Sequence, residues 1–333
     1  MSGFRRRLMM AAQGGAAPMP KDYVKFEILT DGTVTFVFKT TTTSSDAEYL
    51  QYSFDGGNTW ETCENPASKT AEKSWSMDVE SGDIILWKGS ASCYNPNVTN
   101  TIKSTRFGGT ATYNLSGNIM SLLSENFENM TTIPANYCFC GLFAGARIVS
   151  AYGLSFPATS LKTDCYRNMM YGCTYLTTAP AVFPAANGTY CWGAIFQGCT
   201  NLVNPPSLPA NATGNSCYIS MFNGCTKLET APILPYTGKI GQNAYRQMFY
   251  GAKKLNYVKA LHTSYNSGGM FQWMQNVAAT GIFVKNINAT WTDSGVGGVP
   301  TGWTVIYYDP STDKYYLSDK TTECDDHGNV INA

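Results

Sequence analysis

Charged residues are scarce in this sequence. Of 333 residues, 23 are Lys or Arg and 23 are Asp or Glu, so the formal net charge is zero. Nucleic-acid binding needs clustered positive charge, which makes nucleic acid an unsuitable partner. Apolar runs are also short, and none approaches the roughly 18 residues that a membrane-spanning helix needs. We therefore expect no nucleic-acid partner and no transmembrane segment.

Catalytic and metal-binding patterns are missing as well. The two histidines, His262 and His327, stand outside any His-Glu-x-x-His pattern, and neither a Gly-x-Ser-x-Gly motif nor a phosphate-binding loop is present. The segment 324–327 (Cys-Asp-Asp-His) has metal-ligand chemistry, but a solvated acidic tail is the simpler interpretation. We predict a non-enzymatic protein without a catalytic residue, cofactor or metal. An acid pair for glycoside hydrolysis, hidden in the amino-terminal domain, stays open as an alternative.

A short apolar pattern recurs from Phe139 to Ala278. In each copy, apolar residues stand at positions i, i+3, i+4 and i+7, the spacing of one stripe on two turns of α-helix. Successive copies are 26 or 27 residues apart, within the range of leucine-rich repeats. The six copies are Phe139/Leu142/Phe143/Ala146, Tyr166/Met169/Met170/Cys173, Trp192/Ile195/Phe196/Cys199, Tyr218/Met221/Phe222/Cys225, Tyr245/Met248/Phe249/Ala252 and a degenerate Phe271/Met274/Gln275/Ala278.

The rest of each copy predicts how the helix ends. Gly-Cys-Thr-x-Leu follows the stripe three times, beginning at Gly172, Gly198 and Gly224, and glycine suits the left-handed backbone at a helix end. A small residue or proline comes next, and proline favours an extended chain. We therefore expect a mixed α and β solenoid of the leucine-rich-repeat type, with one short helix and one short strand per turn.

The repeat motif resembles the BspA-like leucine-rich repeat proteins of gut Bacteroidales and their phages. The resemblance is carried by 217–228 (Cys-Tyr-x-x-Met-Phe-x-Gly-Cys-Thr-x-Leu) followed by 231–235, and by the matching residues 191–202 with 205–210. It implies a surface or adhesion protein, and it brings no catalytic residues to carry over. The similar phage proteins also suggest that Arg5, Arg6 and Arg7 form a peg that docks into another virion protein.

The N-terminus imitates an export signal without completing one. The arginines precede only about five apolar residues, Leu8–Ala12, whereas an export signal requires 7 to 15. We expect this segment to stay uncleaved and residues 1–21 to form a flexible arm.

The sequence predicts β-structure on both sides of the repeats. Residues 22–113 alternate polar and apolar positions, with turn signals at Asp31-Gly32, Asp55–Asn58 and Ser81-Gly82. We expect three β-hairpins in an antiparallel β-sandwich. The solenoid with its caps follows at 114–300, and 301–333 is expected to form a C-terminal β-hairpin and tail.

Six of the 11 cysteines recur with the repeat, which predicts two ladders of buried thiols. One ladder comprises Cys165, Cys191 and Cys217, and the other Cys173, Cys199 and Cys225. Disulfides between neighbouring turns stay open for a chain that matures in an oxidising place.

These patterns favour a phage virion component, a fibre, tail or capsid-surface protein located on the particle surface. Its partners would be other virion proteins or a host cell-surface protein or glycan, and a homo-oligomer is possible. The alternative is an exported adhesin on a bacterial cell surface. The candidate binding face, in loops that can vary without touching the core, comprises Thr189, Tyr190, Asn215, Lys239 and Gln242. The candidate assembly contacts are Arg5, Arg6, Arg7, Tyr307, Tyr308, Tyr315 and Tyr316.

Overall fold

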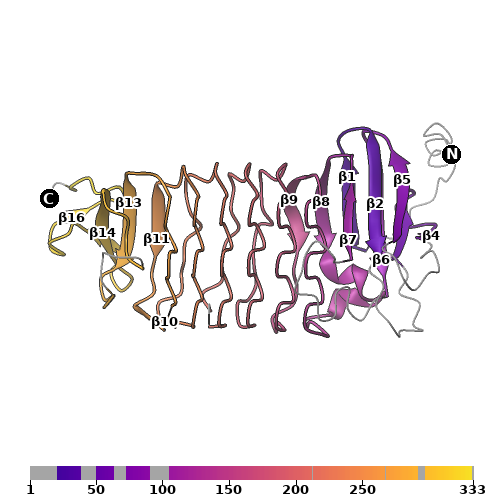
Figure 1. Ribbon diagram of the computed structural model, residues 1–333. Helices are drawn as coiled ribbons and strands as arrows, with labels where there is room; N and C mark the ends of the chain where they lie inside the picture. The colour runs from indigo at the N-terminus through magenta and orange to yellow at the C-terminus, as the bar shows by residue number, and fades with distance from the viewer. Residues whose placement is uncertain are drawn as a thin grey trace.

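The computed structural model describes residues 21–38, 50–63, 73–90, 105–211, 213–266, 268–291 and 297–331. The molecule is elongated, with β-sheets at both ends and a row of stacked turns between them (Figure 1). Arg5, Arg6 and Arg7 lie outside the described residues. Within the described ranges, no helix has the length and apolar character that a membrane span requires.

Two sheets face each other at the amino-terminal end. Phe26 and Trp87 of one sheet pack against Phe107 of the other, with ring centroids 5.1 and 5.0 Å from that of Phe107. The first sheet has the order β4-β3-β6-β1-β8-β9 and the second the order β5-β2-β7. The strands are β1 (Val24–Ile28), β2 (Gly32–Phe38), β3 (Leu50–Ser53), β4 (Glu61–Thr62), β5 (Lys73–Val79), β6 (Ile84–Gly89), β7 (Arg106–Gly109), β8 (Tyr113–Asn118) and β9 (Ile148–Ser155).

The expected hairpins at Asp31-Gly32 and Ser81-Gly82 are wrong. β1 pairs with β6 and β8, whereas β2 pairs with β5 and β7, so the first turn carries the chain from one sheet to the other. The second turn does the same between β5 and β6. At the first turn, both flanking strands bury every second residue, a pattern that strands in opposite sheets satisfy as well as hydrogen-bonded neighbours. Only the middle pair, β3 with β4, is bonded as expected.

The first sheet is mixed and extends past residue 113, which corrects the purely antiparallel sandwich. β8 runs parallel to β9, and single parallel bridges then link Ser150, Thr178 and Asn204 in consecutive turns. A further bridge joins Thr230 to Tyr257 of β11 (Tyr257–Ala260), which is parallel to β13 (Gly281–Asn286). One face of the molecule is therefore lined by parallel pairings along much of its length.

The expected fold class, with a helix in each turn of a leucine-rich-repeat solenoid, is also wrong. The described residues contain no α-helix; their only helical segments are two short 3₁₀ helices, η2 (Ile119–Leu122) and η3 (Phe127–Asn129). We call residues 137–278 the repeat stack. In it, the segments that carry the apolar stripes are successions of tight turns.

Left-handed backbone at every fourth residue explains these turns. In one segment Ser216 and Ser220 have φ of 53° and 54°, and Gly224 has φ of 75°. Such angles are incompatible with an α-helix. Equivalent triplets with positive φ occur at 137/141/145, 164/168/172, 190/194/198, 243/247/251 and 268/272/276.

The backbone hydrogen bonds of these segments alternate between two directions. The N–H groups of Phe139 and Gly141 donate to carbonyls of the next turn, at 2.8 and 3.0 Å. The intervening N–H groups of Cys140 and Leu142 donate to carbonyls three residues earlier in their own turn, at 2.9 and 3.2 Å. About half of the backbone N–H groups in these segments therefore bond to a neighbouring turn, whereas in an α-helix they would bond within the same segment.

The side chains of the apolar stripes are buried as the spacing requires, although the backbone differs. Phe222 is fully buried between Phe196 and Phe249, with ring centroids 5.7 and 5.6 Å away. In the sixth copy the buried residues begin at Met270, one residue earlier than expected, and Phe271 is exposed.

The cysteines of the repeat stack are buried free thiols. Those at the fourth stripe position, Cys173, Cys199 and Cys225, each donate to a carbonyl of the preceding turn at 3.0 to 3.2 Å. Burial raises the pKa of these thiols, Cys173 to about 12, so they stay protonated and unreactive.

A five-stranded sheet closes the carboxyl-terminal end, in the order β11-β13-β14-β15-β16. β14 (Trp303–Asp309) continues the parallel pairing, and β15 (Lys314–Tyr316) and β16 (Glu323–Cys324) return antiparallel. A small apolar cluster of Val284, Ile306 and Cys324 fixes this return against the sheet. A separate two-stranded sheet, β10 (Lys239–Ile240) with β12 (Ser264–Tyr265), lies at a loop edge of the stack.

Candidate functional site

A groove of about 750 Å³ lies where the carboxyl-terminal return meets the repeat stack. Residues of β11 and β13 line it, and these two strands lie near the end of the row of turns (Figure 1). Its lining residues are Thr230, Ala231, Ile233, Asn256, Tyr257, Lys259, Thr280, Gly281, Ile282, Tyr315, Asp326 and His327.

Parallel pairing builds one wall of the groove. Tyr257 pairs with Thr230 on one side and with Ile282 on the other. Three consecutive turns therefore each contribute outward-facing side chains to a common surface. Gly281 belongs to the same wall, where an added Cβ would meet the Asn256 carbonyl oxygen at 2.4 Å, so a larger residue could not sit there.

Lys259 joins this wall to the carboxyl-terminal return. Its ammonium group donates to the Tyr315 hydroxyl at 2.7 Å and lies 3.6 Å from the ring centroid of Tyr308. It also lies 4.7 Å from the ring centroid of Tyr315. Stacking a cation on two aromatic faces satisfies the charge without a carboxylate partner. The lysine is thus held in place as part of the groove's frame.

The other wall is formed by His327 and Asp326. The Nδ1 atom of His327 lies 2.7 Å from a carboxylate oxygen of Asp326, which orients the imidazole. The ring centroid of His327 lies 5.7 Å from that of Tyr257, so the two rings are neighbours in the lining of the groove. Burial, with the charge of Asp326 and the neighbouring Tyr315, raises the pKa of Tyr257 to about 12. Its hydroxyl is therefore a neutral hydrogen-bonding group at physiological pH.

Asp325, Asp326 and His327 offer ligand atoms within 4.8 Å of one another. Asp325, however, is engaged in its own loop: it accepts backbone N–H groups of His327 and Asn329 and the Asn329 side-chain amide, at 2.8 to 2.9 Å. These bonds lower the pKa of Asp325, with the Asn329 side chain as the main cause. The closeness of these three residues is explained by the hydrogen-bonded turn that they form.

The predicted binding face is partly brought together by the stack. Thr189, Asn215 and Gln242 occupy one column, since each accepts a backbone N–H from the turn before it at 2.8 to 3.0 Å. Asn215 and Gln242 are exposed, and Thr189 is half-buried. The Asn215 side chain also accepts the Gln242 backbone N–H at 3.0 Å, so it supports the loop as well as facing solvent.

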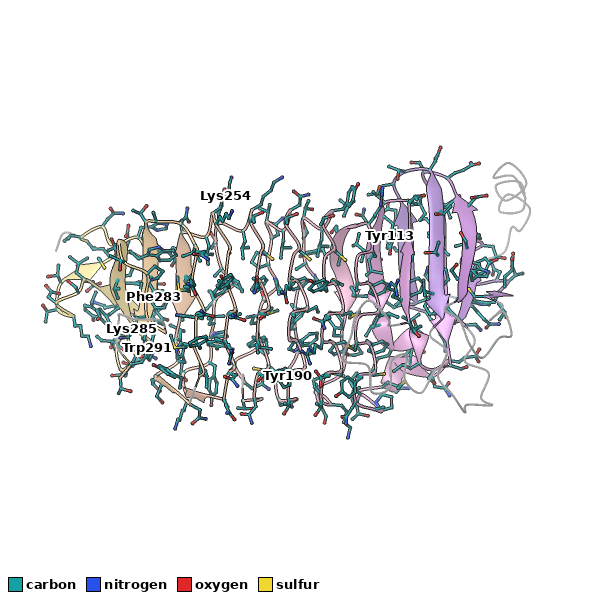
Figure 2. The ribbon with its side chains drawn as sticks, viewed as in Figure 1. Tyr113, Tyr190, Lys254, Phe283, Lys285 and Trp291 are labelled. Carbon is teal, nitrogen blue, oxygen red and sulfur yellow. The ribbon has the colours of Figure 1, made fainter. Side chains whose placement is uncertain are left out.

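Tyr190 and Lys239 lie beside this column. Tyr190 stands at one long edge of the stack and Lys254 at the opposite edge (Figure 2). The Arg167 guanidinium lies 5.0 Å from the Tyr190 ring centroid. Lys239 is exposed in β10.

The four tyrosines expected as assembly contacts have different surroundings. Tyr307 is buried, with the Lys320 ammonium 4.5 Å from its ring centroid. Tyr308 donates its hydroxyl to Asp313 at 2.7 Å. Tyr315 lines the groove, and Tyr316 is half-buried in β15.

Sequence reasoning missed the groove. It set His327 and the acidic residues aside as a tail and gave no role to Tyr257 or Lys259. The available signal was the aromatic side chain at Tyr257 and the charge at Lys259, because the residue that pairs with Tyr257 in the preceding turn is the small Thr230.

No family model matches the chain, and neither a curated protein nor a solved structure is detectably similar to it.

Proposed function

We propose that this chain is a non-enzymatic attachment protein on the surface of a phage particle. The observation that carries the proposal is the groove, which is the size of a small-ligand site and stands at one end of an elongated molecule. A ligand site at the end of a rod suits a protein that must reach a host surface.

The chemistry of the groove favours binding over catalysis. Asp326 is the one carboxylate among its lining residues. Glycoside hydrolysis ordinarily needs a pair flanking the bond to be cleaved. Lys259, the group with most potential as a nucleophile, donates to Tyr315 and is covered by two rings.

The stack supports the same proposal. Its columns of outward residues, such as Thr189, Asn215 and Gln242, lie outside the stacked core. Such columns can change without loss of the fold and would suit contacts with neighbouring virion proteins. The motif resemblance to surface proteins of gut Bacteroidales and their phages points the same way.

The proposal is tested by mass spectrometry and by adsorption. Peptides of the chain should be found in gradient-purified phage particles, and the purified protein should reduce adsorption of those particles to host cells. Peptides found only in a washed outer-membrane fraction would instead identify an exported bacterial adhesin. Particles that contain the chain but adsorb normally in excess purified protein would leave it a virion component without an attachment role.

A further inference from the structure

The groove combines apolar and hydroxyl-binding side chains in one cavity. Ile233, Ile282 and the ring of Tyr257 supply apolar surface, and the exposed imidazole of His327 adds a second ring 5.7 Å from that of Tyr257. Hydroxyl, amide and carboxylate groups line the same groove, on Thr230, Asn256, Tyr257, Thr280 and Asp326.

We propose that this groove binds a neutral saccharide. A sugar ring has an apolar C–H face, which packs on an aromatic ring, and a rim of hydroxyl groups that both donate and accept. The Asp326 carboxylate is a strong acceptor for sugar hydroxyls, because charge-assisted hydrogen bonds exceed neutral ones in strength. A volume of about 750 Å³ lies within the range of small-ligand pockets. The inference rests on the proposed attachment function and names its ligand class.

The charges of the groove argue against anionic ligands. Its one lysine, Lys259, already donates to Tyr315 and lies against two aromatic rings. Asp326 would repel a phosphate or a sugar acid. A neutral hexose or N-acetylhexosamine meets neither obstacle.

The backbone argues against a peptide added as an extra strand. The wall is built from strands that are paired on both sides, since β11 lies between Thr230 and β13. Strand addition requires an unpaired edge, which this wall does not offer. Recognition must therefore use the side chains.

Saturation-transfer NMR and calorimetry on the full chain can test this inference. The probes are glucose, galactose, N-acetylglucosamine and N-acetylgalactosamine, with sialic acid and inorganic phosphate as anionic comparisons. At least one neutral sugar should bind, and both anions should bind more weakly than it. Asp326→Asn should weaken the binding of that sugar by about tenfold or more, because it removes the charged hydrogen-bond acceptor. Tyr257→Phe keeps the ring and should cause a smaller loss.

Glu128→Gln is the matched control, because it neutralises an exposed carboxylate in η3, at the other end of the molecule. Thermal melts of all variants show whether each one folds. Failure of every neutral sugar to bind, or binding that neither groove variant weakens, would overturn the saccharide assignment. If the protein still blocked phage adsorption in that case, the attachment function would survive. Groove-dependent sugar binding by a chain that is absent from particles would support the saccharide assignment and refute the attachment function.

Discussion

Ser220 offers a direct test of the backbone in the repeat stack. It lies inside the stripe that begins at Tyr218, where the helical pattern predicts right-handed backbone, yet its φ is 54°. Left-handed backbone costs an L-residue roughly 1–2 kcal/mol, and glycine avoids that cost. Glycine loses roughly 0.5–1 kcal/mol more conformational entropy on folding than alanine. Ser220→Gly should therefore be more stable than Ser220→Ala by about 0.5–1 kcal/mol.

A helix at the same place would reverse the order. Glycine is about 1 kcal/mol less favourable than alanine in a helix interior. The sign of the difference in unfolding free energy between the two variants distinguishes left-handed from helical backbone at this position. The serine side chain is lost in both variants, so its loss does not affect that sign. Equilibrium urea unfolding measures it, provided that the two variants have equal m-values.

Asn223 provides the control for this experiment. It stands three residues further along the same segment, and its φ is not positive. Asn223→Gly should accordingly be less stable than Asn223→Ala by about 0.5–1 kcal/mol. An alanine variant more stable than the glycine variant at both sites would refute the left-handed assignment.

Two further predictions concern the column and the groove. Asn215→Ala should destabilise the chain by about 1 kcal/mol, because it removes the side-chain oxygen that accepts the Gln242 backbone N–H. Thr189→Ala should cost about 0.5 kcal/mol or less. Urea unfolding compares the two variants, and equal losses of stability would contradict the contribution of this hydrogen bond. Tyr257 should ionise near pH 12, above the ordinary tyrosine value of about 10, so the stability it contributes is present below pH 10 and is lost as pH rises from 10 towards 12. Ultraviolet titration should show a late-ionising tyrosine that Tyr257→Phe removes; an unchanged titration curve would refute the assignment.

Burial in the repeat could be predicted from sequence, but the backbone could not. Spacing of i, i+3, i+4 and i+7 places Tyr218, Met221, Phe222 and Cys225 on one side of a helix, and turns repeating every four residues bury the same positions. The residue types at the left-handed positions carried a signal that distinguishes these turns from a helix. Left-handed positions are occupied by Gly, Asn, Ser, Asp or Gln in most turns, and Gly, Asn and Asp are the residues that tolerate this backbone best.

The strands could be predicted from the sequence, but which strands pair with each other could not. Alternation identifies β1 and β2 because each buries every second residue, as at Phe26 and Phe36. It does not say whether the strands that flank a turn bond to each other or enter opposite sheets. That choice depends on partners distant in sequence, since β1 lies between β6 and β8.

The groove was beyond sequence reasoning for a similar reason. Thr230, Tyr257 and Ile282 meet because turns stack, and a repeat period predicts such neighbours. Tyr315 and His327 arrive from a return of the chain that follows no period. Strand pairing with β14, the Lys259–Tyr315 hydrogen bond and the packing of Cys324 against Val284 and Ile306 fix where that return lies.

The stack can tolerate its strained backbone because each turn is bonded to the next. In the turn at 216–224, two non-glycine residues have left-handed backbone, at a cost of roughly 2–4 kcal/mol. Five backbone hydrogen bonds join this turn to the following one, and at about 0.5–1.5 kcal/mol each they offset that cost. The donors are Ser216, Tyr218, Ser220, Phe222 and Gly224. An isolated turn would lack these bonds, so each turn depends on its neighbours, and the last one needs a cover. The carboxyl-terminal sheet supplies that cover, and the groove lies where its return meets the last turns of the stack.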